Sequence, residues 1–167
     1  FEAAMQRLGG GVISVADAKS SSVVKGESLT DTVRAISGYA DAIVLRHPEE
    51  GAARLAAEVA SVPVINAGDG AGDHPTQALV DLYTLRKERG HIEGLHVALV
   101  GDLRYGRTVH SLAKALGRFS VRLTFVAPPG LAMPQEITHS LKEKGTYIEE
   151  RSDLEEVAGE ADVLYIT

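Results

Sequence analysis

Short apolar runs alternate with amphipathic or polar stretches along most of the chain. Aliphatic and β-branched residues fill the runs at 11–15, 42–46, 62–66, 96–100, 121–126 and 162–166, which we predict to be strands. The stretches at 28–38, 50–60, 75–89, 107–117, 134–144 and 153–159 are predicted to be helices. Near-continuous apolar strands that alternate with helices are typical of parallel sheets covered on both faces. The pattern therefore predicts an α/β fold built from doubly wound parallel sheets.

Residues with known positional preferences stand at several ends of the predicted helices. Ser28 precedes the stretch LTDTVRAIS, and Asp31 follows three residues later, at the spacing of a capping box. Pro134 suits a first helical turn, Gly145 suits a helix end, and Ser152 begins another capping pattern. These residues support the helix limits given above.

The pattern divides the chain into two units of the same kind. The long predicted helix at 75–89 ends in a polar stretch, and a new strand rhythm begins at 96. We therefore place one domain at 1–89 and a second at 90–167. Each has roughly three predicted strands, which is few for an independent sheet. The chain also opens inside an apparent helix and stops at the end of a strand, so we expect both units to be incomplete and the chain to be part of a longer protein.

Composition narrows the class of protein. The chain has 167 residues, of which 44% are hydrophobic and 24% charged, as in ordinary globular proteins. It has no cysteine, which excludes disulfides and thiolate metal sites. The formal net charge is −6 and no basic tract occurs, so nucleic-acid binding is not expected. No apolar run is long enough to cross a membrane. A cytoplasmic protein fits this composition best.

Arg46 is the first candidate site residue. In parallel sheets ligands bind beyond the carboxyl ends of the strands, and Arg46 closes the predicted strand 42–46. A cation at that place is costly unless it faces an anion. The alternative is an ion pair with Glu49 or Glu50, and the sequence leaves both interpretations open. Pro48 is expected to start the next helix, so His47 is expected to be a turn residue or one that supports the ligand-binding residues without contacting the ligand.

A second candidate site lies in the sequence DGAGDHPTQ, which joins a strand to a helix. His74 precedes Pro75, which sets the first helical turn, and Gln77 follows on the same helical face. A helix start of this kind favours negative charge nearby. The simpler interpretation has Asp73 as the helix cap and His74 in solvent. A metal site from Asp69, Asp73 and His74 is disfavoured because no second histidine stands at ligand spacing.

The stretch GDLRYGRTVHS, residues 101–111, has glycines at the spacing of a phosphate-binding P-loop. Arg107, however, replaces the P-loop lysine, and Asp102 adds negative charge where phosphates would lie. The dinucleotide fingerprint also fails, because position 103 is leucine. The planar guanidinium of Arg107 suits bidentate binding of a carboxylate or a phosphate. We therefore expect Arg107 to hold an anion other than a nucleotide.

The segment DAKSSSVVKGES carries Lys19 and Lys25 among small polar residues. It lacks apolar periodicity, and taken alone it is an ordinary surface loop.

Four segments together resemble a known family. VVKGES, VLRHPEEGAARLA, VPVINAGDGAGDHPTQALVDLYTL and VALVGDLRYGRTVHSLAKAL, in this order, are similar to the catalytic chains of the aspartate carbamoyltransferase family. The resemblance extends over essentially the whole chain. The His-Pro-Thr-Gln motif marks transcarbamylases in general, whereas GDLRYGRTVHS points to the aspartate branch.

The resemblance implies a reaction and a set of site residues. The reaction is the transfer of a carbamoyl group from carbamoyl phosphate to the amine of L-aspartate, in pyrimidine biosynthesis, without a cofactor or metal. Arg46, His74 and Gln77 stand at the family's carbamoyl phosphate positions and are the implied catalytic residues. Arg107 stands where the family binds a carboxylate of aspartate. Lys25, with Ser21 as a weaker candidate, lies in the loop lent to a neighbouring subunit.

The resemblance also implies an assembly and marks two departures. Domain 1–89 would bind carbamoyl phosphate and domain 90–167 aspartate, with active sites shared across a homotrimer. The similarity is strongest to bacterial chains that assemble with separate regulatory subunits. The family's Ser-x-Arg-Thr-Arg phosphate loop should precede Phe1, and a second aspartate-binding arginine should follow Thr167. Neither segment is in this sequence.

Two alternatives stay open at this point. The chain could belong to a transcarbamylase for another amino acid such as ornithine, since any α-carboxylate could use Arg107. It could also be a non-catalytic subunit or anion-binding module that keeps the fold without turnover.

Overall fold

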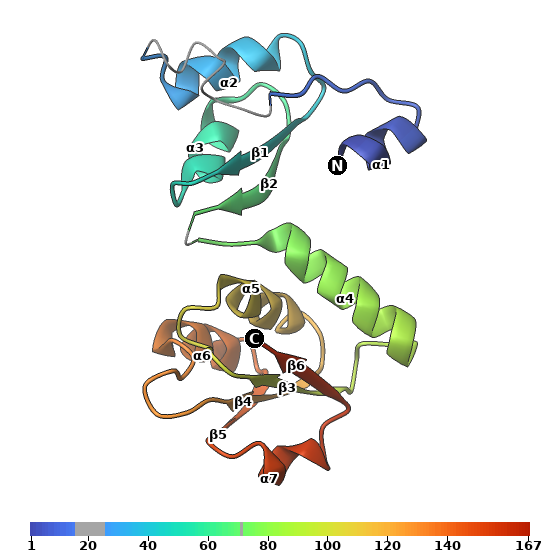
Figure 1. The fold of residues 1–167 in the computed structure, drawn as a ribbon, viewed down its shortest axis with the longest axis vertical. Helices are drawn as coiled ribbons and strands as arrows, with labels where there is room; N and C mark the ends of the chain where they lie inside the picture. The colour runs from blue at the N-terminus through green and yellow to red at the C-terminus, as the bar shows by residue number, and fades with distance from the viewer. Residues whose placement is uncertain (16–25, 71) are drawn as a thin grey trace. The chain divides into compact units, whose positions relative to one another are not determined.

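The chain forms two compact units, Phe1–Gly70 and Ala71–Thr167 (Figure 1). The computed structural model describes residues 1–15, 26–70 and 72–167. Along the sequence, the boundary between the units lies at 70/71, upstream of the domain limit predicted at 89/90. Helix α4 (Pro75–Arg89) belongs to the second unit because it packs on helix α5 (Arg107–Leu116). The assignment of residues 1–89 to carbamoyl phosphate binding and of 90–167 to aspartate binding stays a prediction.

The first unit contains a two-stranded parallel sheet of β1 and β2. Its elements are α1 (Glu2–Arg7), α2 (Leu29–Ser37), β1 (Ile43–His47), α3 (Ala52–Val59) and β2 (Val64–Asp69). The core brings together Val33 of α2, Ile43 of β1 and Ala56 of α3. Helices α2 and α3 therefore share one hydrophobic cluster with the sheet.

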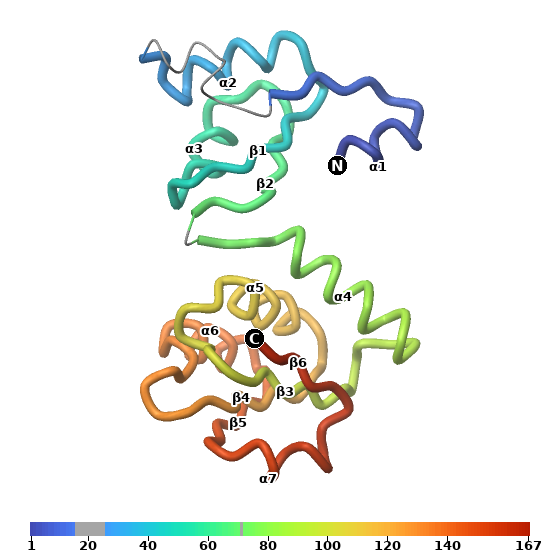
Figure 2. The backbone as a smooth tube through the Cα atoms, in the orientation of Figure 1, coloured from blue at the N-terminus to red at the C-terminus, as the bar shows by residue number. Residues whose placement is uncertain are grey.

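The second unit contains a four-stranded parallel sheet in the order β5-β4-β3-β6. Besides α4 and α5, its elements are β3 (His96–Val100), β4 (Arg122–Val126), α6 (Gln135–Glu143), β5 (Tyr147–Arg151), α7 (Glu155–Ala158) and β6 (Val163–Ile166). Figure 2 follows the backbone through this unit. Parallel strands and intervening helices agree with the predicted α/β class.

Alternate residues of β3 are buried in two different hydrophobic clusters. Val97 and Leu99 belong to the main core with Leu112 of α5, whereas Ala98 packs with Val157 of α7. Successive side chains of a strand point to opposite faces of the sheet. Helices therefore cover both faces of this sheet, which confirms the doubly wound architecture for the second unit.

The predicted strand at 11–15 was wrong. These residues form no strand, and all five side chains are exposed. In the described part of the chain they have no strand to pair with, and an apolar run alone does not make a strand without a ladder partner.

Strand β5 was missed by the sequence pattern. Its sequence is YIEER, in which charged residues outnumber apolar ones. The strand pairs with β4, where Arg122 binds Glu149 at 3.1 Å and stacks over the Tyr147 ring at 5.5 Å. Cross-strand contacts therefore support an edge strand whose own sequence does not indicate one.

The predicted helix ends had mixed outcomes. The Ser28 hydroxyl accepts the N–H of Asp31 at 3.2 Å, which confirms the cap of α2. Gly145 has a φ of +80° just after α6, as a helix-ending glycine should. Pro134 is the N-cap of α6 rather than a residue of its first turn. Ser152 does not cap α7; the Asp153 carboxylate accepts the N–H of Glu155 there instead.

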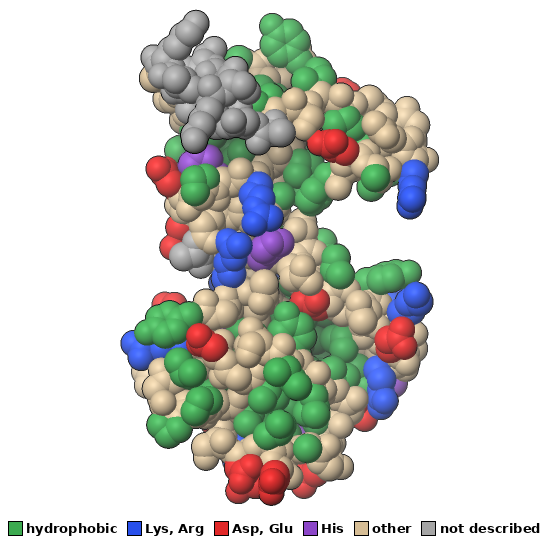
Figure 3. Space-filling model, viewed as in Figure 1, with side chains coloured by type: hydrophobic (Ala, Val, Ile, Leu, Met, Phe, Trp, Pro, Cys, Tyr) green, Lys and Arg blue, Asp and Glu red, His purple; other side chains and the backbone are tan. Residues whose placement is uncertain are grey.

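Apolar side chains also remain at the surface. Val44 and Ile65 in the first unit are 43% and 41% exposed, and Leu164 and Ile166 of β6 are 41% and 71% exposed. Figure 3 shows hydrophobic side chains gathered on one face of the second unit. The described helices therefore leave part of each sheet uncovered. None of the helices described is long and apolar enough to span a bilayer.

Candidate functional site

His74 is the N-cap of helix α4. Its ring Nδ1 accepts the backbone N–H of Gln77 at 3.3 Å. An imidazole nitrogen that accepts a hydrogen bond carries no proton, so the neutral ring has its proton on Nε2. The cap therefore turns His74 Nε2 into a hydrogen-bond donor at the start of a helix. The interpretation with Asp73 as cap and His74 in solvent was wrong.

The start of α4 is anchored to α5. The His74 backbone N–H donates to the Ser111 hydroxyl at 2.8 Å, and Ser111 is buried. Asp73 accepts from the Lys114 ammonium at 2.8 Å, so its carboxylate is engaged on α5 and not on its own helix. Ser111 and Lys114 were not among the predicted site residues, because the contact joins segments 37 residues apart.

Gln77 lies in the first turn of α4, beside His74. Its side-chain amide donates from Nε2 to Asp81 Oδ1 at 2.9 Å. A carboxylate can only accept, so the nitrogen of this amide faces Asp81 and the oxygen faces elsewhere. Asp81 was not predicted either, although its spacing of four residues from Gln77 was a signal for this contact.

Arg107 is the first residue of α5 and is half-buried. Ser111 follows one helical turn later and binds the backbone of His74. The structure thus places Arg107, the residue predicted to bind aspartate, on a helix that packs beside the helix carrying His74 and Gln77.

The loop before α5 does not act as a phosphate cradle. Asp102 Oδ1 accepts the backbone N–H groups of Arg104 at 3.1 Å and Tyr105 at 3.0 Å. A P-loop would offer such N–H groups to phosphate oxygens. Gly101 has a φ of +116°, and a Cβ there would overlap the Thr167 carbonyl oxygen at the end of β6. The loop geometry therefore agrees with the rejection of a P-loop.

Tyr165, on strand β6, lies near side chains of both α4 and α5. Its hydroxyl interacts with the side chains of Thr108, the second residue of α5, and Asp81 of α4. Burial raises the pKa of Tyr165 above its ordinary value of 10.0, and the negative charge of Asp81 acts in the same direction, whereas the hydrogen bond with Thr108 opposes it. Tyr165 therefore stays a neutral hydroxyl at physiological pH.

In the first unit, Arg46 is exposed on β1 next to a register irregularity. Leu45 pairs with Asn66 and His47 with Asp69, so β2 advances three residues where β1 advances two. Bulges of this kind re-aim side chains and occur often near functional sites. In the described ranges Arg46 forms no ion pair with a glutamate of the following turn, so the alternative interpretation of Arg46 finds no support.

The turn after Arg46 is held by His47 and Asp69. His47 is the last residue of β1, so the prediction of a turn residue was wrong. Its Nδ1 accepts the N–H of Glu49 at 3.1 Å, and its carbonyl accepts that of Gly70 at 2.8 Å. Asp69 is buried, and its Oδ2 accepts the N–H of Gly51, the N-cap of α3, at 3.1 Å. Asp69 thus stabilises α3. No group of three metal-ligating side chains occurs in the part of the chain that is described.

Lys25 and Ser21 lie outside the described residues, so their predicted roles stay predictions.

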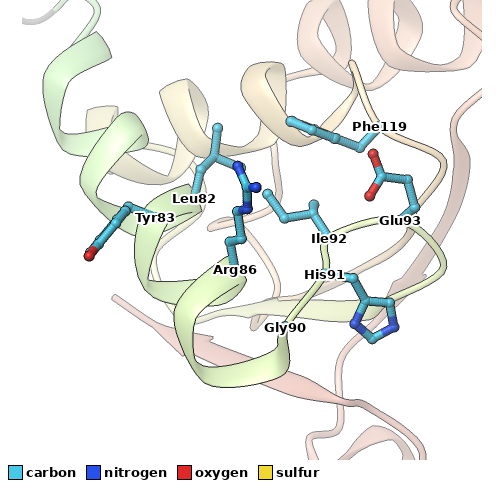
Figure 4. A pocket seen from close by; sticks show the side chains of 8 residues that line it. All are labelled: Leu82, Tyr83, Arg86, Gly90, His91, Ile92, Glu93 and Phe119. Atoms are coloured by element: carbon cyan, nitrogen blue, oxygen red, sulfur yellow. The ribbon is translucent and has the colours of Figure 1, made fainter.

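A pocket of about 570 Å³ lies at the far end of α4 (Figure 4). It is lined by Leu82, Tyr83, Arg86, Gly90, His91, Ile92, Glu93 and Phe119, and the Tyr83 ring points away from the others in the figure. Because α4 has 15 residues, its two ends are about 22 Å apart. This pocket is therefore separate from the predicted site at the start of the helix.

The chain belongs to the aspartate/ornithine carbamoyltransferase family. The family's carbamoyl-P binding domain matches residues 1–87, and its Asp/Orn binding domain matches residues 93–167. Together these matches cover nearly the whole sequence, which confirms the resemblance inferred from the four motifs.

Two relatives within this family are named aspartate carbamoyltransferase catalytic subunits. The catalytic subunit from Methanothrix thermoacetophila is 60% identical over 167 residues, which are 100% of this chain and 55% of the relative. That from Thermococcus onnurineus is 58% identical, with 100% and 54% covered. This chain therefore spans about half the length of the curated relatives it matches.

Solved structures agree with these relatives. The catalytic subunit of M. jannaschii aspartate transcarbamoylase superimposes with a TM-score of 0.89 at 58% identity, covering 99% of this chain and 54% of that one. Aspartate transcarbamoylase from Trypanosoma cruzi, solved with carbamoyl phosphate and aspartate, gives a TM-score of 0.89 at 47% identity, with 98% and 54% covered. The predicted fold class is thereby confirmed.

Proposed function

We propose that the full-length protein containing this chain transfers a carbamoyl group from carbamoyl phosphate to L-aspartate. The products are N-carbamoyl-L-aspartate and phosphate. The names of the relatives favour aspartate over ornithine as the acceptor. The observation that carries the proposal is the hydrogen bond from Gln77 N–H to His74 Nδ1, because it prepares a donor for the reacting carbonyl group.

His74 is the proposed donor to the carbonyl oxygen of carbamoyl phosphate. When the amine of aspartate attacks the carbamoyl carbon, negative charge develops on that oxygen. A fixed donor aimed at a developing oxyanion typically lowers the barrier by about 3 kcal/mol. What supports this role is that the cap and the bond to Ser111 hold both the tautomer and the backbone of His74 in place.

Gln77 and Arg46 are proposed to complete the contacts with carbamoyl phosphate. The Gln77 amide oxygen, opposite the nitrogen held by Asp81, would accept from the carbamoyl NH₂ group. Arg46 would place its guanidinium against the carbonyl and phosphate oxygens, a task suited to its planar fork. Its exposure and the bulge beside it support a role in ligand binding over one in the core.

Arg107 is proposed to bind a carboxylate of aspartate. Two anionic substrates repel each other, so cations that hold both supply much of the catalysis by positioning them. The departing phosphate can accept the proton of the attacking amine, and no covalent nucleophile is needed. The place of Arg107 on α5, which is fastened to the start of α4, supports this division of roles.

We further propose a homotrimer in which Lys25 completes the site of a neighbouring subunit. Cytoplasmic location, a place in pyrimidine biosynthesis and attachment of regulatory chains belong to the same proposal. They follow from the family resemblance and from the catalytic-subunit names of the relatives.

An assay of the full-length protein tests the proposal. Carbamoyl phosphate is offered with aspartate, ornithine or other amino acids, and carbamoylated product is measured. We expect turnover with aspartate and none with ornithine. Turnover with ornithine alone would refute the acceptor, and binding of a bisubstrate analogue in calorimetry without any turnover would favour a non-catalytic anion-binding module.

A further inference from the structure

Asp81 occupies a place on α4 that stability does not explain. It lies inside a helix, where aspartate is a poor helix former. Its Oδ1 accepts from Gln77, but its Oδ2 is buried without a hydrogen-bond partner in the described part of the chain. A buried polar atom left unsatisfied is unfavourable, and such atoms in native proteins often mark functional positions.

The bond between Asp81 and Gln77 has a chemical consequence. A free glutamine amide can present either its NH₂ or its oxygen to a ligand, because a rotation of half a turn exchanges the two. The Asp81 carboxylate accepts from Nε2 at 2.9 Å and can only accept, so it selects one of these two orientations. The selected orientation leaves Gln77 Oε1 as the acceptor on the other side of the amide.

We propose that Asp81 is a positioning residue that makes Gln77 specific for an NH₂ group on the acyl phosphate substrate. This inference rests on the proposed function and deepens it. Asp81 acts through Gln77 and does not touch the substrate. Its chemical effect is to distinguish a carbamoyl group from an acetyl group of nearly the same shape, because a methyl group cannot donate to Gln77 Oε1.

Tyr165 of β6 lies near this carboxylate. Burial and the negative charge of Asp81 raise the pKa of the Tyr165 hydroxyl, and Thr108 acts on the same hydroxyl in the opposite direction. Thr108 is the residue after Arg107 in the first turn of α5. Tyr165 therefore lies close both to the helix that orients Gln77 and to the helix that carries Arg107.

The test uses the full-length protein and two probes that differ in one group. Carbamoyl phosphate is the substrate, and acetyl phosphate, which carries methyl in place of NH₂, is added as the competing analogue. KM for the first and the inhibition constant for the second are measured at saturating aspartate. The variants are Gln77→Ala, Asp81→Asn, Asp81→Ala and the double variant Gln77→Ala/Asp81→Asn. Glu88→Gln removes an exposed carboxylate from the same helix and is the matched control.

We expect Asp81→Asn to reduce the preference for carbamoyl over acetyl phosphate about three- to tenfold, the effect of one ordinary hydrogen bond. Asp81→Ala should reduce it at least as much, and Glu88→Gln should not change it. The double variant should match Gln77→Ala alone, because Asp81 acts only through that amide. The melting temperature of the Asp81 variants should be unchanged or raised, which a purely structural residue would not give.

Several outcomes would overturn the inference. If Gln77→Ala reduces the preference but both Asp81 variants leave it intact, Asp81 has no positioning role, and the proposed function still stands. The same holds if the effects of Gln77→Ala and Asp81→Asn multiply in the double variant. If the unaltered protein does not use carbamoyl phosphate, or Gln77→Ala has no effect, the proposed role of Gln77 fails and this inference fails with it.

Discussion

The ring of His74 accepts the backbone N–H of Gln77 at 3.3 Å and thereby caps helix α4. The two ring nitrogens of His74 thus have different roles. Nδ1 stabilises the helix, and Nε2 is left with the proton that the proposed reaction needs. The two tasks can be separated, because asparagine is a good helix cap but has no group at the position of Nε2.

His74→Asn should keep the helix and lose the catalysis. We expect its melting temperature to stay close to that of the unaltered protein, and kcat to fall about 10²- to 10³-fold, as when one oxyanion donor is removed. His74→Ala should lose the cap as well, at about 1 kcal/mol of stability. Steady-state kinetics and thermal unfolding of both variants measure this. Unchanged kcat in His74→Asn would mean that the ring serves the helix alone.

Arg107→Ala should raise KM for aspartate on the order of a hundredfold, the loss of a charge-assisted bidentate contact, and leave binding of carbamoyl phosphate nearly unchanged. Arg107→Lys should be intermediate, since lysine keeps the charge without the fork. Arg118→Ala, an exposed arginine just beyond the end of α5, is the control. A collapse of carbamoyl phosphate binding with normal aspartate dependence would assign Arg107 to the other substrate.

Mixed trimers test the sharing of sites between subunits. Lys25→Ala and Arg46→Ala should each be nearly inactive as pure trimers. When equal amounts are dissociated and reassembled, about one quarter of the sites should combine an intact Lys25 with an intact Arg46 from a neighbour, by chance pairing in a cyclic trimer. Activity near that fraction is expected. Verified mixed trimers without activity would show that each site is formed within one chain.

Asp162 should make folding sensitive to acid. The backbone N–H of His96 donates to its carboxylate at 2.9 Å and, with the charge of Arg89, holds its pKa below the ordinary value of 3.8. A carboxyl whose pKa is lowered by folding stabilises the fold above its unfolded pKa, and this is lost as the pH falls through its folded pKa. Asp162→Asn should therefore be less stable than the unaltered protein at pH 7, and the difference should shrink below pH 4. Urea unfolding across pH measures it; a constant difference would contradict this role.

Regular elements with their own apolar pattern were predicted well. Helix α4 and strand β3 have the limits expected from the sequence, because each carries its signal locally: Pro75 and Gly90 bound the helix, and His96–Val100 is buried almost throughout. Strand β5 could not be predicted this way, because neighbouring side chains on β4 stabilise it.

The candidate site was predicted in part for the same reason. His74, Gln77 and Arg107 stand in motifs that can be recognised along the sequence. Ser111 and Tyr165 act across helices and strands, so only the folded chain brings them to the site. For Asp81, the sequence spacing indicates a contact with Gln77. Its proposed role depends on the orientation of the Gln77 amide, which only the structure gives.

The most direct test of the proposed chemistry is a structure of the full-length protein with a bisubstrate analogue that joins the acyl phosphate to aspartate. We expect His74 Nε2 within about 3 Å of the analogue's carbonyl oxygen while Nδ1 still caps α4. We also expect the Arg107 guanidinium on a carboxylate of the aspartate part. A His74 ring turned away from the carbonyl, with Arg107 in contact with no carboxylate, would contradict the account.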